Sequence, residues 1–258
     1  MKKDIKLCLS GSGTPFYYHF GAYIRLYESF NITDLVGVSG GFILASLIAL
    51  YKEPRIIKKN LDNFNLSDVK DFNFNIFDYN SILLGNKILE LFKKYFNYQF
   101  KDIRFNLSGI ATKIDDLSEV VFNHRNTPDI FLYDSLRASM SIACVFQPHI
   151  INNEKYFDGG YVNNCPHDFW GNNENVYTVK ISDNKKYTVN NILDASIVSQ
   201  FASIKANELK HKQDNPKGHY IEIINEFDFL RFDFTTKEKN KMIKDGYKAV
   251  DNYLKKEK

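Results

Sequence analysis

The first fifty residues of this chain constrain its fold more than any other stretch, because they alternate between strand and helix patterns. Residues 5–9 form a short apolar run that predicts a buried strand, and residues 15–29 carry apolar side chains at helical spacing. The same order of patterns then recurs, with a buried strand predicted at 34–38 and an apolar helix at 40–51. This alternation is typical of a parallel sheet with helices on both faces. We therefore expect an α/β fold of three layers, α/β/α, around a mainly parallel central sheet.

The rest of the chain continues to mix helix and strand patterns. Residues 54–100 are mostly helical in pattern, and Asp134 is placed to cap a short helix that runs to Ala143. Further strands are predicted near 103–112, 118–123, 175–181 and 219–224, and further helices at 192–209 and 236–254.

The first predicted helix carries two local signals. Thr14 and Pro15 have the residue types of an N-cap and a first helical position. Gly21 lies inside the helix, where glycine costs about 1 kcal/mol relative to alanine. We therefore expect Gly21 to permit the close approach of a neighbouring backbone.

Charge and cysteine content exclude some classes of function. The net charge of the 258 residues is only +3 and the basic residues are spread out, which argues against a nucleic-acid partner. The cysteines, Cys8, Cys144 and Cys165, lack the spacing of zinc ligands, so no metal site is expected. An odd and sparse set of cysteines is typical of a reducing compartment.

The apolar runs are too short for membrane insertion. The longest, residues 42–50, covers about half a bilayer, and the N-terminus lacks the apolar core of a secretory signal peptide. We expect no transmembrane segment, and a location in the cytoplasm or at the periphery of a membrane.

The sharpest functional signal is the pentapeptide from Gly37 to Gly41, which fits the pattern G-x-S-x-G around Ser39. It lies between an apolar strand and an apolar helix, which is the context that a nucleophile elbow needs. The flanking glycines allow a sharp turn that exposes the serine hydroxyl, and the helix that follows presents N–H groups to the same site. The alternative is an ordinary turn between strand and helix with a capping serine.

A second glycine turn, at residues 10–13, ends the first predicted strand. If the two strands are adjacent and parallel, this turn and Ser39 lie at the same edge of the sheet. The backbone N–H groups of Gly11, Ser12 and Gly13 would then form an anion-binding concavity, suited to the oxyanion of an acyl transfer reaction. A dinucleotide site is less well supported because Phe16 stands where G-x-G-x-x-G needs glycine, and a phosphate-binding P-loop lacks its Gly-Lys-Ser/Thr ending.

A carboxylate that could act as the base is found in the third motif, Asp158-Gly159-Gly160. The two glycines allow a turn that directs the carboxylate outward. Because Asp-Gly also favours hairpin turns, this motif taken alone predicts a hairpin turn rather than a site.

Together the three motifs resemble those of the patatin-like phospholipases. The 10–13 turn, with His19 and Gly21, is similar to the family's glycine-rich segment. Gly37–Gly41 is similar to the family's nucleophile elbow. Asp158–Gly160 is similar to its D-G-G motif, together with the following residues Asn163-Asn164-Cys165-Pro166. Residues 136–148 resemble the helix and loop before that motif, and Gly246-Tyr247 resembles part of the last helix. The similarity extends over most of the chain, which predicts one patatin-like catalytic domain over residues 1–258.

The resemblance implies a lipid acyl hydrolase with a catalytic dyad of Ser39 and Asp158. Ser39 would attack an ester carbonyl, Asp158 would take its proton, and the N–H groups of Gly11, Ser12 and Gly13 would bind the oxyanion. The substrate would be a lipid or phospholipid at a membrane surface, and no cofactor would be needed.

The sequence departs from the family pattern at four positions. Ser12 replaces a glycine, Pro15 stands at a position that is usually basic, Phe16 replaces another glycine and narrows the mouth of the site, and Ala143 replaces a frequent proline. Pro15 and Phe16 support an alternative function, a weak or inactive lipid-binding or scaffold protein of the same fold.

A further alternative is an esterase with a Ser–His–Asp triad, since His211 and His219 follow Asp158 along the chain. His19 is expected to be a packed helix residue rather than a base. The Phe-rich stretch at 72–79 and the apolar stripe at 88–96 are expected to pack in the core, the alternative being a wall for an acyl chain or an interfacial surface.

Overall fold

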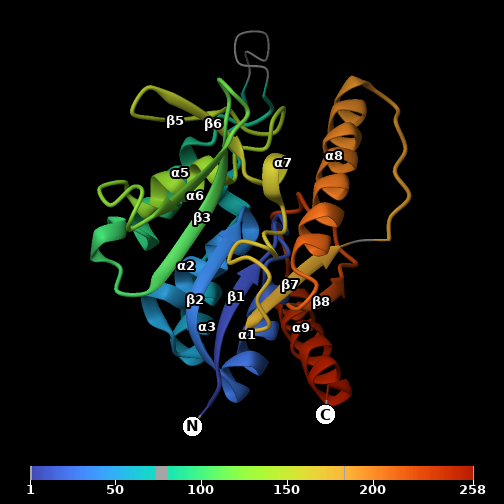
Figure 1. Cartoon of the computed structure of the whole chain (residues 1–258). Helices are drawn as coiled ribbons and strands as arrows, with labels where there is room; N and C mark the ends of the chain where they lie inside the picture. Colours follow the sequence, from blue (N-terminus) through green and yellow to red (C-terminus); the bar gives the residue numbers. More distant parts are fainter. Residues whose placement is uncertain (1, 74–80, 183, 258) are drawn as a thin grey trace.

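The computed structural model describes residues 2–73, 81–182 and 184–257 (Figure 1). Its strands are β1 Asp4–Leu9, β2 Asn31–Val38, β3 Asn106–Lys113, β4 Glu119–Asn123, β5 His149–Ile151, β6 Glu154–Asp158, β7 Val176–Ser182 and β8 His219–Ile224. Its helices are α1 Tyr17–Ser29, α2 Gly40–Tyr51, α3 Pro54–Asn63, α5 Asn86–Tyr95, α6 Leu132–Ser139, α7 Gly160–Asn163, α8 Ile192–Asp214 and α9 Thr236–Lys256, with 3₁₀ turns at Ser67–Val69 and Phe100–Asp102.

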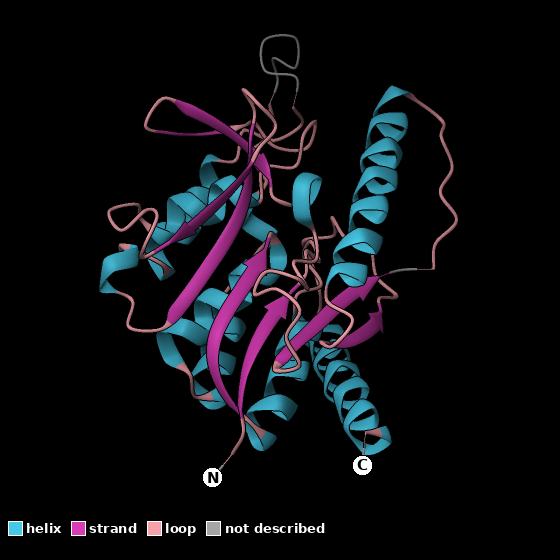
Figure 2. Cartoon of the chain, in the orientation of Figure 1, coloured by secondary structure: helices cyan, strands magenta, loops and turns pink. Residues whose placement is uncertain are grey.

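One mixed sheet organises the fold. Its strand order is β5-β6-β3-β2-β1-β7-β8, with β4 paired to β3 outside this path. The pairs among β3, β2, β1, β7 and β8 are all parallel, whereas β4, β5 and β6 pair antiparallel. Figure 2 shows the arrowheads of the parallel strands directed toward the part of the molecule where α7 and α8 lie. The expected α/β fold with a mostly parallel sheet is confirmed.

The two faces of the sheet are covered unequally. The large core includes Leu7, Leu9 and Leu35 of the sheet together with buried residues of α1, α2 and α9. Alternate strand residues point to the opposite face, where Cys8, Val36, Val38 and Ile110 form a smaller cluster with Val162, Phe169 and Trp170.

Close packing of α1 against α9 explains Gly21. A Cβ on Gly21 would overlap the carbonyl oxygen of Ile243, and a Cβ on Gly246 would overlap that of Tyr18. The expectation that Gly21 permits close backbone approach is therefore confirmed. The apolar stripe at 88–96 is also core, since Ile88, Phe92 and Phe96 are buried.

Three local expectations are wrong. Helix α1 begins at Tyr17 without a side-chain cap, because the Thr14 hydroxyl bonds elsewhere. Helix α6 ends at Ser139 rather than Ala143, and Asp134 lies inside its first turn, where a carboxylate oxygen bonds His149. The third motif, which taken alone predicts a hairpin turn, does not form one, and the hairpin in this region joins β5 and β6. Its turn is Asn152-Asn153, both at positive φ, rather than the Asp-Gly of the third motif.

Most of the Phe-rich stretch at 72–79 lies outside the described residues. Its first residue, Phe72, is exposed, so the expectation of core packing does not hold for that side chain. Within the described part of the chain, no helix combines the length and apolar character needed to cross a bilayer.

Candidate active site

Strand register brings the second and third motifs together. Val38, the last residue of β2, pairs with Ile110 of β3, and the next residue of β3, Ala111, pairs with Asp158 at the end of β6. Strand β6 thus continues along β3 from the point where β2 ends. Ser39 and Asp158 meet there, and the Ser39 hydroxyl donates a hydrogen bond to the Asp158 carboxylate.

Ser39 has the backbone conformation of a strained turn. Its φ of 50° and ψ of −123° lie in a region that residues with a side chain seldom adopt. The surrounding structure holds it there: the Ser39 N–H donates to Oγ of Ser139 at 2.9 Å, and that hydroxyl donates to the Ile110 carbonyl at 2.6 Å. The flanking motif glycines, Gly37 and Gly41, lie at the end of β2 and the start of α2.

Asp158 is a buried carboxylate held by two donors. The Gly160 N–H donates to Oδ1 at 2.7 Å, and the Ser39 hydroxyl provides the other hydrogen bond. Burial raises the pKa of Asp158 from 3.8 to about 6, although both hydrogen bonds favour the charged form and oppose the rise. Gly159 completes the turn, with its N–H directed to the Ser139 carbonyl at 3.4 Å. The carboxyl group therefore changes charge close to neutral pH.

The turn after β1, Ser10–Thr14, is here called the 10–14 loop, and it is anchored at both ends. The Gly11 N–H donates to the carbonyl oxygen of Asn164 at 2.8 Å, and the Thr14 N–H donates to that of Phe229 at 2.9 Å. Among the described residues, no protein group accepts a hydrogen bond from the N–H of Ser12 or Gly13. The loop differs here from the sequence expectation, because the Gly11 N–H is already used.

Gly13 cannot be replaced by a residue with a side chain without strain. Its φ is 55°, and a Cβ would overlap the Phe229 carbonyl oxygen. The close approach of the Phe229 carbonyl is therefore one reason why residue 13 of the loop is glycine.

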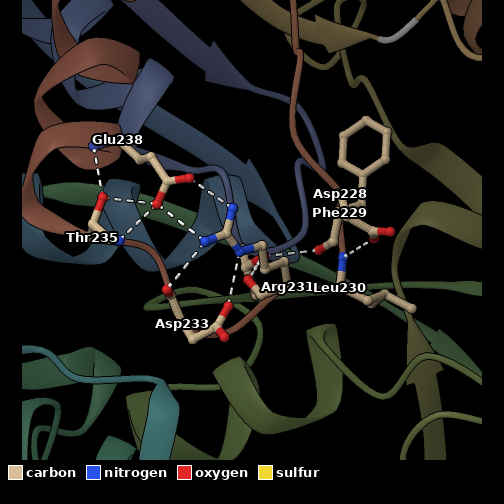
Figure 3. Close-up of polar contacts among 8 residues, drawn as sticks. Asp228, Phe229, Leu230, Arg231, Asp233, Thr235 and Glu238 are labelled. Carbon is tan, nitrogen blue, oxygen red and sulfur yellow. Dashed lines mark hydrogen bonds and ion pairs between the residues drawn. The ribbon is translucent and has the colours of Figure 1, made fainter.

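The segment that contacts Thr14 carries a network of charged residues, and Figure 3 shows Arg231, Asp233 and Glu238 in this network. The Thr14 hydroxyl donates to the Arg231 carbonyl at 2.6 Å. The Arg231 guanidinium bonds Asp233 at 2.8 Å and Glu238 at 2.7 and 3.1 Å, and Glu238 also closes a capping box with Thr235 at the start of α9. Arg231 and the Thr235 donors lower the pKa of Glu238 to about 2. The segment around Arg231, which contacts the 10–14 loop, is thus bonded to the start of α9.

The site opens into a cavity of about 680 Å³. Ser12, Gly13, Ser39 and Asp158 all line it. Apolar walls come from Ile142, Ile197, Phe201, Phe229 and Leu230, and a charged part contains Lys180, Glu208, Lys212 and Glu222. Helix α8 supplies residues to both parts. A cavity of this size and mixed lining can hold a ligand with a long apolar group beside the Ser39 hydroxyl.

The three histidines considered from the sequence bond other groups. His19 is fully buried under the 10–14 loop, where its Nε2 is 2.9 Å from the Ser10 carbonyl oxygen and burial lowers its pKa to about 4. Nδ1 of His211 bonds Asp168 at 2.8 Å, and Nδ1 of His219 bonds the Tyr253 hydroxyl at 3.0 Å. None of them contacts Ser39 or Asp158, which leaves the Ser–His–Asp alternative without a base.

The unusual residues of the first motif lie away from the cavity. Phe16 is fully buried and stacks on Tyr17, so the expectation that it narrows the mouth of the site is wrong. Pro15 is also absent from the cavity lining. Over the residues that the structure describes, no group of three His, Cys, Asp or Glu side chains is arranged to hold a metal ion.

A sequence model of the patatin-like phospholipases matches residues 7–169, well over half of the chain. The chain belongs to this family. It is 29% identical over 197 residues to a protein named probable lipid hydrolase 463L of Invertebrate iridescent virus 6, covering 69% of this chain and 67% of that protein. It is also 25% identical over 175 residues to uncharacterized protein R571 of Acanthamoeba polyphaga mimivirus, covering 62% of this chain and 59% of that protein.

Solved structures of two bacterial proteins have the same fold. VipD of Legionella pneumophila matches 99% of this patatin-like chain with a TM-score of 0.62 and 14% identity, over 67% of its own length. ExoU of Pseudomonas aeruginosa, solved with SpcU, matches 99% with a TM-score of 0.51 and 14% identity, over 53% of its length. The chain therefore spans between about half and two thirds of the proteins that it matches.

Several residues of the site carry no signal in the sequence. Lys180, Glu208 and Phe229 follow the matched region, and each is more than 130 residues from Ser39. They are brought to the cavity by β7, α8 and the segment before α9, and no local pattern predicts such contacts.

Proposed function

We propose that this patatin-like chain is a serine carboxylic-ester hydrolase that removes acyl groups from lipids or phospholipids at a membrane surface. The observation that carries the proposal is the hydrogen bond from Ser39 to a buried Asp158, in one cavity with the Ser12 and Gly13 N–H groups, for which the described part of the chain offers no acceptor. Family membership supports a lipid substrate, and the apolar walls of the cavity suit an acyl chain.

In the acylation step, Oγ of Ser39 attacks the ester carbonyl carbon while its proton moves to Asp158. The carbonyl oxygen becomes an oxyanion, and we assign its stabilisation to the N–H groups of Ser12 and Gly13 rather than to Gly11. When the tetrahedral intermediate collapses, the ester C–O bond breaks, and Asp158 returns its proton to the departing alcohol. The acyl group is then bound to Ser39.

In the deacylation step, water takes the place of the alcohol. Asp158 accepts a proton from the water as its oxygen attacks the acyl carbon, and the same two N–H groups hold the second oxyanion. Collapse releases the fatty acid and returns the proton to Ser39 Oγ. Each step is balanced, and it requires no group beyond the protein, the ester and water.

The raised pKa of Asp158 suits this role. A carboxylate with an ordinary pKa is a weak base for a serine hydroxyl, whereas a pKa of about 6 makes it stronger and leaves it ionised at neutral pH. The raised pKa also means that the ionised Asp158 is less stable in the folded protein than in water, because its charge is buried.

A non-catalytic lipid-binding protein is the second candidate. It was motivated by Pro15 and Phe16, and neither of these residues lines the cavity. The catalytic proposal is therefore favoured on geometry.

Covalent labelling tests the proposal. A fluorophosphonate probe should add to the wild-type protein at Ser39, and intact mass should show no adduct on Ser39→Ala. Asp158→Asn should lose most of its turnover of a fatty-acyl ester, and His211→Ala and His219→Ala should keep theirs. A folded wild type that neither reacts with the probe nor hydrolyses lipid esters would favour the binding protein.

A further inference from the structure

Helix α8 contributes to the cavity although it lies beyond the part of the chain that matches the family. The match ends at residue 169, and α8 spans Ile192–Asp214. Of the side chains described in this helix, residues 194–214, only Glu208 is buried. A helix that buries a charged residue and exposes or half-buries the rest is not held by an ordinary apolar core. The partners of Glu208 therefore show what the helix does.

Glu208 contacts two groups at the base of the cavity. One carboxylate oxygen accepts a hydrogen bond from Nδ2 of Asn164 at 2.5 Å, and the same carboxylate forms an ion pair with Lys180 of β7. The side chains of Lys180 and Glu208 are 8% and 9% exposed. A buried carboxylate is costly unless its charge is balanced and its oxygens are bonded, and these two partners do both.

Asn164 links Glu208 to the 10–14 loop. Its carbonyl oxygen accepts the Gly11 N–H at 2.8 Å, and its side-chain Oδ1 lies so close to Gly11 that a Cβ there would overlap it. Asn164 therefore accepts a hydrogen bond from Gly11 with its backbone and donates one to Glu208 of α8 with its side chain. No other described residue accepts the Gly11 N–H.

Helix α8 also reaches the other end of this loop. The Phe201 ring lies 6.0 Å from the Phe229 ring, centroid to centroid, and the Phe229 carbonyl accepts the Thr14 N–H. One helix thus contacts the residues that hold both ends of the loop, and between these ends the Ser12 and Gly13 N–H groups have no acceptor among the described residues.

We propose that Glu208 is a positioning residue for the reaction: through Asn164 it fixes Gly11, and so sets the direction of the Ser12 and Gly13 N–H groups toward the oxyanion. Lys180 serves as its counter-ion. This inference rests on the proposed hydrolase function of the site. It assigns part of the catalytic geometry to a helix outside the family match, and it predicts that movement of α8 alters the rate of the chemical step.

The test compares Glu208→Ala with Asp214→Asn, a change to an exposed carboxylate in the last residue of the same helix. Misdirected N–H groups cost transition-state stabilisation, so Glu208→Ala should lower kcat on a soluble short-chain ester by about 10- to 100-fold with little change in KM. The rate of fluorophosphonate labelling of Ser39 should fall by a similar factor. Asp214→Asn should match the wild type in both assays.

Hydrogen exchange gives a readout that does not depend on activity. The Gly11 amide should exchange about fivefold faster in Glu208→Ala, the size expected for weakening one hydrogen bond, and at the wild-type rate in Asp214→Asn. Unchanged exchange at Gly11 overturns the proposal, even if the wild type is found to be inactive. Failure of the hydrolase proposal itself would appear separately, as a wild type that is not labelled.

A double-mutant cycle separates action through Asn164 from a direct effect on substrate. If Glu208 acts through Asn164, the effects of Glu208→Ala and Asn164→Ala on kcat are not additive. Additive effects, or a change in KM alone, would mean that Glu208 only shapes the binding wall, and would overturn the proposal. If Glu208→Ala fails to fold, Glu208→Gln replaces it in every assay. The amide oxygen of the glutamine can still accept a hydrogen bond from Asn164, so the kcat of Glu208→Gln should be higher than that of Asn164→Ala. A kcat of Glu208→Gln equal to or below that of Asn164→Ala would also overturn the proposal.

Discussion

Replacing Asp158 by asparagine should stabilise the folded protein at neutral pH although it should remove most of the activity. Asparagine has the shape of the protonated carboxyl group. Its amide oxygen can accept the Gly160 N–H, which now lies 2.7 Å from Oδ1, and its NH₂ group can donate to the Ser39 hydroxyl. The variant therefore keeps both hydrogen bonds and loses only the buried charge.

The size of the effect follows from the pKa of Asp158. Burial raises this pKa from 3.8 to about 6, so the folded state binds the proton more tightly than the unfolded chain does. Its contribution to stability is full below the unfolded pKa and is lost as the pH rises through about 6. At about 1.4 kcal/mol for each pH unit between the two pKa values, ionising Asp158 costs the folded state about 3 kcal/mol at pH 8.

Urea unfolding of wild type and Asp158→Asn at two pH values measures this cost. At pH 8 the variant should have the higher free energy of unfolding by about 2–3 kcal/mol, and at pH 4.5 the difference should shrink to about 1 kcal/mol. Asp214→Asn, which changes an exposed carboxylate, should show no comparable gain.

Two results would refute the reasoning. An Asp158→Asn variant no more stable than wild type at pH 8 would mean that burial does not penalise the Asp158 charge. A gain of equal size at both pH values would show that the stabilisation comes from packing or hydrogen bonds rather than from ionisation.

Three further predictions follow from the same geometry. Since a protonated Asp158 cannot accept the Ser39 proton, a pH–rate profile should show kcat/KM falling about tenfold per pH unit below about 6; a flat profile would exclude Asp158 as the base. Gly13→Ala should slow fluorophosphonate labelling at least about 100-fold, because the Cβ would displace the loop from the Phe229 carbonyl, with circular dichroism as the check on folding. Ser139→Ala leaves the buried Ser39 N–H without its acceptor and should lower the free energy of unfolding by about 1–3 kcal/mol, measured in urea, whereas an unchanged value would mean that Ser139 does not hold the turn.

Elements with a strong local pattern were predictable from the sequence. The helix at 40–51 and the strand at 219–224 have the predicted bounds in the structure. Both have continuous apolar or alternating patterns, which depend only on neighbouring residues. The hairpin of β5 and β6 was missed because its strands are short and its turn, Asn152-Asn153, resembles other polar loops in this Asn-rich chain.

The sequence predicts which residues lie at the site, but only part of the hydrogen bonds that these residues form. The motif around Ser39 identified a turn between strand and helix, and the structure has that turn. The glycine turn predicts that the Gly11 N–H binds the oxyanion, whereas in the structure this N–H donates to the Asn164 carbonyl oxygen. A glycine turn shows that N–H groups are available locally, but not which of them the rest of the chain will use.

By itself the sequence determined the alternation of strands and helices, the position of the serine turn and the motifs that mark the family. These properties follow from backbone preferences and apolar spacing over a few residues. Only the tertiary structure decided that β6 pairs with β3 just beyond the end of β2, which places Asp158 beside Ser39 and buries it. The tertiary structure also decided that Glu208 of α8 bonds the side chain of Asn164. The burial of Asp158 and its contact with Ser39 depend on segments more than a hundred residues apart, and the sheet brings these together when the chain folds.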